Sequence, residues 1–240
     1  MYNRLLQIGL HVAFKVIMAP STRSCYSRSH GSPTSPAFLA VVSLVLVYTG
    51  LSIPVIITHG RADGIGPILA AFRDRLPGRA MVHGAPSHLS AIDEAFVCKA
   101  IRPMLRMGMM AEDFRPGAAY RDEEVERLSL RDTGDIIDLF QHYPDNFFEP
   151  AQLATGHYYG IRAEGRLASV AGVHVVSEAN AVACLGNIVT HPDHRGQGLS
   201  TTCTSHLCAA LIEAGVRILA LNVDRHNRSA VRVYEKLGFL

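Results

Sequence analysis

The sequence has no aspartate or glutamate before Asp63, although arginines and a lysine occur in that stretch of the 240-residue chain. An acid-free N-terminus that contains arginine and serine is typical of an organelle transit peptide. The stretch from Ser21 to Ser35 is rich in Ser, Arg, Gly and Pro, a composition typical of a linker. We therefore expect residues 1–36 to be a disordered extension, with organelle targeting as the alternative.

The cysteines form no C-x-x-C pair, and their number, five, is odd. Zinc sites and disulfide-rich secreted domains depend on paired spacings of this kind. Their absence favours free thiols in a reducing compartment, and hence a cytoplasmic protein. We expect each thiol to serve as a small core side chain, at Cys25, Cys98, Cys184, Cys203 and Cys208.

The chain also lacks a large excess of charge of either sign, since its formal net charge is +2. Proteins that bind nucleic acid usually carry a basic field on one face. We therefore expect no nucleic-acid partner.

No apolar run is long enough to cross a bilayer, which takes about 20 residues of helix. The longest run, Ala37 to Tyr48, is followed by interruptions at Gly50 and Pro54. We predict a buried helix over Ala37–Tyr48, a turn at Gly50 and a buried strand over Val55–Thr58. A membrane tether through residues 37–57 is the alternative.

Residues 37–118 contain no catalytic motif of their own, and in particular no G-x-S-x-G elbow of the kind that hydrolases use. Apolar spacing and turn residues predict a small N-terminal α/β unit. Its further elements are a helix over Ile65–Arg75, a strand over Met81–His83 and a helix over Leu89–Ala100 capped by Ser87 or Ser90. A methionine cluster follows that is suited to filling gaps in a core, at Met104, Met107, Met109 and Met110.

Residues 121–240 predict a second domain, because strand-like apolar runs alternate there with amphipathic segments. The expected strands are Val125–Leu130, His157–Ala163, Arg166–Ser177, Val182–Val189 and Ile218–Val223. The expected helices are Gly134–Tyr143, capped by Asp132 or Thr133, then Leu199–Ala214 and Asn227–Leu237. The last two strands flank a crossover helix, which favours parallel pairing between them.

The run Arg195-Gly196-Gln197-Gly198 separates a predicted strand from the helix that begins at about Leu199. Glycines let backbone N–H groups approach a ligand, and a helix start adds unpaired donors and the positive end of the dipole. Arg195 adds a charge and several donors. The pattern therefore predicts an anion site. His191 and His194 flank it, but two ligands do not make a metal site, and we expect none.

A dinucleotide-binding turn is one alternative, since it reads G-x-G-x-x-G with an acid about twenty residues later. Gly196, Gly198 and Asp224 fit this pattern. Thr201, however, stands where the third glycine is required, and the preceding strand ends in His-Pro. This alternative is the weaker one.

The sequence resembles the GNAT superfamily of acyl-CoA-dependent N-acyltransferases in two motifs. The first is Thr190-His-Pro-Asp-His-Arg-Gly-Gln-Gly-Leu-Ser200, which matches R-x-x-G-x-G/A except for serine at the last small position. The second joins Leu221-Asn-Val to Asn227-Arg-Ser-Ala-Val-Arg-Val-Tyr-Glu-Lys-Leu-Gly-Phe239. The resemblance covers about half the chain. In having long apolar segments and a separate N-terminal unit, the chain also resembles the glycine N-acyltransferase-like branch of the superfamily. It implies an α/β (α+β) fold: a GNAT-type mixed sheet flanked by helices, preceded by the small α/β unit.

The resemblance implies that acetyl-CoA is the acyl donor and lies between two diverging parallel strands. Its pantetheine arm is then expected at the backbone of Ile188, Val189 and Thr190. The pyrophosphate and neighbouring groups are expected at Arg195, Gly196, Gln197, Gly198, Leu199, Ser200, Asn222 and Asn227. Tyr234 is the implied acid that protonates the leaving thiolate; the alternative is a tyrosine buried at helical spacing.

The general base is less well defined. Many relatives place a glutamate at the position of Asn187, and an amide cannot accept a proton at neutral pH. His174, in the middle of a strand, is the best substitute, because the pKa of histidine lies near neutrality. The alternative is a histidine satisfied within the sheet. Glu149 and His157 are further candidates.

These features together predict an enzyme that transfers acetyl from acetyl-CoA, by direct attack, to a primary amine of a small-molecule or amino-acid-like acceptor. Self-association into a homodimer is left open. The alternative is a non-catalytic acyl-CoA-binding or regulatory module, motivated by Asn187 and by the end of the sequence at Leu240, where relatives continue into another strand. We expect either that this strand is absent or that the N-terminal unit covers its place.

Overall fold

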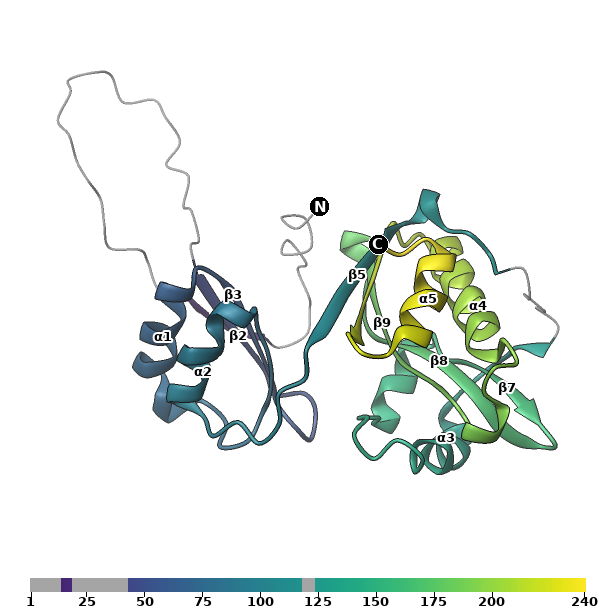
Figure 1. Cartoon of the computed structure of the whole chain (residues 1–240), viewed down its shortest axis with the longest axis horizontal. Coiled ribbons are helices and arrows are strands. Elements are labelled where there is room, and N and C mark those ends of the chain that lie inside the picture. The colour runs from purple at the N-terminus through teal and green to yellow at the C-terminus, as the bar shows by residue number, and fades with distance from the viewer. Residues whose placement is uncertain (1–13, 19–42, 118–123) are drawn as a thin grey trace, which may run out of the picture. The chain divides into compact units, whose positions relative to one another are not determined.

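A computed structural model of the chain describes residues 14–18, 43–117 and 124–240 (Figure 1). The described residues form two compact units, one ending at Ile101 and the other beginning at Arg102. Among the residues that the structure describes, no helix combines the length and the apolar character needed to cross a bilayer.

The N-terminal unit is a four-stranded sheet with two helices. Its strands follow the order β1 (Phe14–Met18), β2 (Ser43–Tyr48), β3 (Val55–Gly60) and β4 (Met81–His83). The first three are antiparallel, whereas β3 and β4 are parallel and joined through α1 (Ala62–Ala71) and η2 (Arg73–Arg75). After β4 come η3 (Pro86–His88) and α2 (Leu89–Ala95). The core is aliphatic: Val45, Val47, Ile56, Ile65, Ile68, Leu69 and Ile92.

Three predictions for this unit need correction. The predicted helix over Ala37–Tyr48 is strand β2 from Ser43 onward, and residues 37–42 lie outside the described residues. Alternate side chains of β2 are buried, which suits its β-branched valines and its place between two partner strands. The predicted extension likewise contains a paired strand, since β1 bonds to β2. The helix predicted over Leu89–Ala100 ends at Ala95, and no side chain caps its start.

The C-terminal unit is a six-stranded mixed sheet. Its order is β5 (Met104–Met110), β10 (Ile218–Asp224), β9 (Val182–Thr190), β8 (Arg166–Ser177), β7 (Tyr159–Ala163) and β6 (Glu126–Arg127). Only the pair of β9 and β10 is parallel, as predicted from the crossover helix between them. The predicted mixed sheet flanked by helices is thus confirmed.

Strand β5 belongs to this sheet and not to the N-terminal unit, in which the sequence boundary at residue 118 had placed it. It pairs with the whole length of β10, and Met107 and Met109 are buried in the core of the C-terminal unit. On its other side, Gly108 exchanges two backbone hydrogen bonds with Leu240, of 2.9 and 3.0 Å. Met107 and Met109 therefore fill a core, as predicted, but in the second unit, whereas the prediction is wrong for Met104, which is exposed.

Three helices cover the sheet: α3 (Thr133–Phe140), α4 (Leu199–Glu213) and α5 (Arg228–Leu237). Helices α4 and α5 lie side by side, and α3 lies across the sheet from them (Figure 1). Strand β8 contacts both α3 and α4, and it is buried continuously from Leu167 to Val173 because both of its faces are covered. Short 3-10 turns complete the unit: η4 (Ala111–Asp113), η6 (Leu130–Asp132), η7 (Pro150–Thr155), η8 (Glu178–Asn180) and η9 (Pro192–His194).

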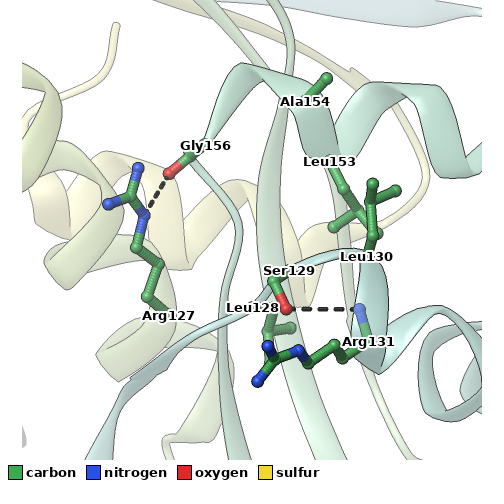
Figure 2. Close-up of a pocket in the computed structure, with 8 residues that line it drawn as sticks. All are labelled: Arg127, Leu128, Ser129, Leu130, Arg131, Leu153, Ala154 and Gly156. Atoms are coloured by element: carbon green, nitrogen blue, oxygen red, sulfur yellow. Dashed lines mark hydrogen bonds between the residues drawn. The ribbon is translucent and has the colours of Figure 1, made fainter.

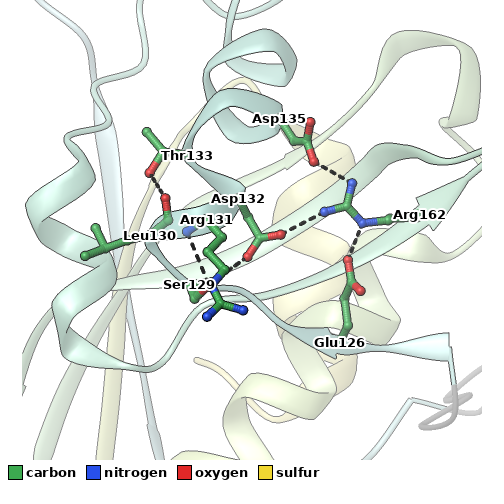
Figure 3. Close-up of polar contacts among 8 residues, drawn as sticks. All are labelled: Glu126, Ser129, Leu130, Arg131, Asp132, Thr133, Asp135 and Arg162. Atoms are coloured by element: carbon green, nitrogen blue, oxygen red, sulfur yellow. Dashed lines mark hydrogen bonds and ion pairs between the residues drawn. The ribbon is translucent and has the colours of Figure 1, made fainter.

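Arg162 links strand β7 to β6 and to the first turns before and within α3 (Figure 3). Arg162 of β7 lies 2.5 Å from a Glu126 carboxylate oxygen, 2.9 Å from Asp132 and 2.6 Å from Asp135. Asp132 also accepts the backbone N–H of Ser129 at 2.8 Å. Strand β6 therefore ends at Arg127, before the predicted end at Leu130. The Asp132 side chain bonds to Ser129 and does not cap α3, so that predicted cap is wrong.

The cysteines within the described residues are free, as predicted. Cys203 and Cys208 are buried core side chains on α4, and burial raises the pKa of Cys203 to about 12. Cys98 is exposed, so the expectation of a core position is wrong there.

Candidate active site

The parallel strands β9 and β10 separate part-way along their length. Backbone pairing runs from Val182 beside Ile218 to Leu185 beside Leu221 and then stops, although both strands continue. Parallel strands that lose their pairing leave backbone donors and acceptors open between their carboxyl ends, where α/β sheets usually bind ligands. The strands predicted to diverge around an acyl donor therefore do diverge.

The separation coincides with a bulge in β9. Gly186 pairs with Gly172 and Val189 with Val170, so two residues of β9 face one residue of β8. Asn187 is the first of the two, and its φ of 54° lies in the left-handed region that asparagine tolerates better than most residues. Asn187, at which the family resemblance implies a glutamate in many relatives, is thus a backbone irregularity that redirects the strand.

The side chain of Asn187 is buried in a chain of hydrogen bonds. Its amide nitrogen donates to the Tyr158 hydroxyl at 2.8 Å and to Gln152 Oε1 at 3.0 Å. The Tyr158 hydroxyl donates to the Val173 carbonyl at 3.1 Å. Burial raises the pKa of Tyr158 to about 12, so the phenol holds its proton at neutral pH. Neither Tyr158 nor Gln152 was identified from the sequence, because nothing in their local pattern marks them.

His174 lies at a second irregularity, where the pairing of β8 with β9 shifts between Val173 and Val175. It is exposed, and its Nδ1 lies 3.3 Å from Gln152 Nε2. Its Nε2 lies against Gly186, since a Cβ on that glycine would be only 1.9 Å away. His174 and Asn187 thus share Gln152 as a partner; their predicted catalytic roles stay predictions.

The remaining candidates for the base lie close to the same network. The backbone N–H of Glu149 donates to Gln152 Oε1 at 2.9 Å. His157 has a buried Nδ1 without a hydrogen-bond partner, and desolvation, with a smaller effect from Arg127, lowers its pKa. Both residues therefore lie beside the bulge rather than at the predicted phosphate loop.

The predicted phosphate loop, Arg195-Gly196-Gln197-Gly198, has the form expected of an anion site. Gly196 and Gly198 have φ of 77° and 84°, values that favour glycine, and a Cβ on Gly196 would meet no neighbouring atom. Helix α4 begins directly after Gly198 with no side-chain cap and no acidic residue in its first turn. Its first N–H groups, from Leu199 to Thr201, are therefore not occupied by a capping side chain.

Tyr143 links this loop to the gap between the strands. Its hydroxyl donates to the Thr190 carbonyl and accepts from Arg195 Nη2 at 2.9 Å. The backbone N–H of His191 donates to the Ala168 carbonyl in β8. The Thr190 carbonyl, at the opposite side of the same peptide group, therefore points away from β8. Tyr143 thus orients Arg195, a role that no local sequence pattern indicated. His191 Nδ1 accepts from the Asp193 backbone at 3.3 Å, which is a local cap and not a ligand pair.

Positive charge continues around the carboxyl end of β10. Arg225, Arg228 and Arg232 line a small groove with Leu105 and Val231. Asn227 caps α5, as predicted, by accepting the Ala230 N–H at 3.1 Å. Asn222, just past the last pairing with β9, is exposed and accepts from Arg106 Nε at 3.2 Å. These cations suit a ligand with several negative charges.

Tyr234 lies on α5 in the core of the unit, with its ring 6.0 Å from that of Phe239. Burial, with a smaller effect from Cys208, raises its pKa above the usual range. The phenol therefore carries its proton at neutral pH, as an acid must before the reaction. Its predicted role as the acid stays a prediction.

A shallow pocket of about 460 Å³ is lined in part by η7 (Figure 2). Leu153 and Ala154 of η7 line it, next in sequence to Gln152, which contacts Asn187. Arg127 borders the pocket and donates to the Gly156 carbonyl at 2.7 Å. The remaining lining residues are Leu128, Ser129, Leu130 and Arg131.

Comparison with known proteins finds curated relatives and solved structures that are similar to this chain. Curated relatives include the [ribosomal protein bS18]-alanine N-acetyltransferase of Escherichia coli strain K12, 36% identical over 81 residues, which are 34% of this chain and 53% of that protein. A mycothiol acetyltransferase of Streptomyces scabiei is 27% identical over 207 residues, covering 76% of this chain and 63% of that protein. The chain thus spans about half to two thirds of the length of these relatives.

Solved structures agree on the fold. A putative GNAT-family acetyltransferase of Novosphingobium aromaticivorans has a TM-score of 0.50 at 26% identity, covering 59% of this chain and 61% of that one. A GCN5-related N-acetyltransferase of Kribbella flavida has a TM-score of 0.56 at 15% identity over 83% of this chain and 82% of its own. The sequence model described as "Acetyltransferase (GNAT) family" matches residues 120–239, half of the chain. The chain therefore belongs to the GNAT acetyltransferase family.

Proposed function

We propose that this protein is an N-acetyltransferase that transfers acetyl from acetyl-CoA to a primary amine of a small or amino-acid-like acceptor. One observation carries the proposal: β9 and β10 part after Leu185 and Leu221, directly beside an uncapped helix start. A long anionic thioester needs both features, an open strand edge for its arm and N–H donors for its phosphates.

The residues present fit such a donor. The open side of Gly196 lets a phosphate approach the loop, and Arg195, held by Tyr143, supplies a guanidinium beside it. Ile188, Val189 and Thr190 line the gap and would pair with the arm through their backbone. Asn222 and the cations after β10 would face its other side.

When bound, the thioester supplies an activated acetyl carbonyl. The acceptor nitrogen attacks that carbon, the C–N bond forms, the C–S bond breaks and the nitrogen loses a proton. Backbone N–H groups at the bulge would stabilise the oxyanion without moving, because Asn187 and its buried partners hold the strand in place. Tyr234 would hold a proton on its phenol oxygen and give it to the departing thiolate.

The pocket beside η7 supports an acceptor that carries both an apolar part and an anionic group. Leucines and an alanine line it, and Arg127 and Arg131 border it. The short helix η7 contributes both to this pocket and, through Gln152, to the hydrogen bonds at the bulge, so an acceptor held there would lie near β9. The names of the two relatives refer to an alanine of ribosomal protein bS18 and to mycothiol.

The test is thiol release from acetyl-CoA by purified full chain against a panel of amines. The panel holds free amino acids, amino sugars and peptides that begin with alanine. We expect turnover with at least one class, and the class identifies the acceptor. Calorimetric binding of coenzyme A without turnover on any amine would instead support the non-catalytic acyl-CoA-binding module.

Replacement of the proposed acid gives a sharper test. Tyr234→Phe should lower kcat by about 100-fold and leave the affinity for coenzyme A nearly unchanged, because only the proton on the leaving thiolate is lost. Tyr159→Phe is the matched control, since Tyr159 is also buried but stacks on His206 with ring centroids 4.5 Å apart. An equal loss of kcat in both variants would contradict the assignment.

A further inference from the structure

The buried hydrogen bonds around Asn187 leave no freedom in the direction of their protons. The chain has two fixed ends, the backbone N–H of Glu149, which can only donate, and the Val173 carbonyl, which can only accept. Because the Glu149 N–H points at Gln152, the atom there must be the amide oxygen, 2.9 Å away. The orientation of an amide side chain is set in this way by its partners.

The same reasoning runs from the other end. The single hydroxyl proton of Tyr158 is used on the Val173 carbonyl, so the Tyr158 oxygen must accept from Asn187 at 2.8 Å. Asn187 therefore presents its NH₂ group to Tyr158 and, at 3.0 Å, to Gln152 Oε1. Both ends agree that Gln152 turns its oxygen toward Asn187 and its NH₂ group away.

The NH₂ group of Gln152 then lies 3.3 Å from His174 Nδ1. An amide N–H can only donate, so Nδ1 accepts and the proton of the neutral imidazole is on Nε2. That nitrogen lies against Gly186, the residue before the bulge, where β9 has just lost its pairing with β10. Only a glycine leaves room for the ring there, since a Cβ would be 1.9 Å from Nε2.

We infer that Gln152 is a positioning residue that holds His174 in the Nε2–H tautomer, so that His174 presents a hydrogen-bond donor, and not a base, at the point where the strands separate. The sequence-based assignment of His174 as base would require an open lone pair on Nδ1, which Gln152 occupies. The consequence for catalysis rests on the proposed function, whereas the tautomer does not.

The test is a long-range ¹H–¹⁵N correlation spectrum of the full chain labelled with ¹⁵N-histidine, which distinguishes the two tautomers by the shifts of the ring nitrogens. The His174 signals are assigned by their loss in His174→Gln. In the wild type we expect the Nε2–H pattern. In Gln152→Glu the carboxylate still accepts from Glu149 and Asn187 but cannot donate, so we expect His174 to move its proton to Nδ1 or to become doubly protonated.

Gln141→Glu is the control for charge, because Gln141 is exposed at the end of α3, where it bonds to Asp138. It should leave the His174 pattern unchanged. Gly186→Ala, which changes no polar group, should shift the His174 signals by displacing the ring. The wild-type measurement decides the matter if Gln152→Glu does not fold: an Nδ1–H pattern in the wild type overturns the inference.

Activity gives a separate readout. In Gln152→Leu we expect kcat to fall about tenfold with the KM for acetyl-CoA within about twofold, because the donor at Nε2 loses its orientation while the phosphate loop is untouched. If the wild type shows the Nε2–H tautomer but acetylates no amine, the proposed function fails and the positioning of His174 stands. If Gln152→Glu folds and leaves the tautomer unchanged, the inference fails whatever the activity.

Discussion

Each unit contains a strand, a helix and a second strand parallel to the first. Of these two motifs, only the one in the C-terminal unit has a helix start without a carboxylate in its first turn, as the predicted anion site requires. In both, a Thr-His pair lies at or next to the end of the first strand, and two glycines follow it with the same spacing. The residues are Thr58, His59, Gly64 and Gly66 in one unit, and Thr190, His191, Gly196 and Gly198 in the other. In the C-terminal unit the glycines form a loop before α4, whereas in the N-terminal unit they lie inside α1.

The ends of the strands differ as well. Beside β3, the buried His88 bonds to the Thr58 hydroxyl at 2.9 Å and to the Gly60 carbonyl at 3.0 Å, and Asp63 lies in the first turn of α1. At the end of β9, Thr190 has partners of its own, because its hydroxyl lies 2.8 Å from that of Ser169 and its carbonyl accepts from Tyr143. The clearer difference is that α4 has no acid in its first turn. A G-x-G pattern after a strand is therefore not sufficient for an anion site. The helix must begin after the glycines, and its first N–H groups must be left without a competing carboxylate.

The largest expected effect comes from giving α4 the acid that α1 has. Ser200 holds the same place in α4 that Asp63 holds in α1, the second residue of the helix. Ser200→Asp should weaken coenzyme A binding by about 30-fold or more, because a carboxylate then faces the diphosphate at short range. Titration calorimetry measures the change, with Ser200→Asn as the control for size. Unchanged affinity in Ser200→Asp would remove the phosphate site from this loop.

A smaller effect is expected from opening the closed end of β3. His88→Phe removes the partner of the buried Thr58 hydroxyl and that of the Gly60 carbonyl, and should lower the free energy of unfolding by about 2 kcal/mol. Urea denaturation monitored by circular dichroism measures it. His226→Phe, at an exposed histidine, should cost much less. Equal stability of the two variants would show that His88 does not hold this strand end.

The smallest effect is expected from removing the acid of α1. Arg61 and Asp63 form an ion pair of 2.7 Å, but their side chains are 69% and 67% exposed, so Asp63→Ser should move Tm by less than about 2 °C. Coenzyme A should still bind once per chain, since His88 continues to close the strand end. A second equivalent of bound coenzyme A in calorimetry would mean that the acid alone separates the two motifs.

Patterns local in sequence were sufficient to predict much of the C-terminal unit. The glycines of the phosphate loop and the cap at Asn227 needed only spacing and residue type. The strand β2 was misread as a helix because a short apolar run has no periodicity to separate the two states. Only its partners on both sides, which are distant in sequence, show that it is a strand.

The sequence predicted the glycine turn and the helix start of the candidate site, and it missed the contacts between side chains from distant segments. Gln152 and Asn187 are 35 residues apart, and Tyr143 and Arg195 are 52 apart. No local pattern relates such pairs. The bulge at Asn187 was also missed, since a positive φ at a residue other than glycine leaves little trace in one sequence.

The pairing of β5 decides where this protein can be divided. A fragment cut at the limit of the family match, near residue 120, would lack β5 and strip β10 of its antiparallel neighbour along seven residues. The result is a bare, apolar sheet margin of the kind that recruits other chains into aggregates. A fragment that starts at Arg102 keeps β5, so this margin stays covered and the acetyltransferase sheet stays complete.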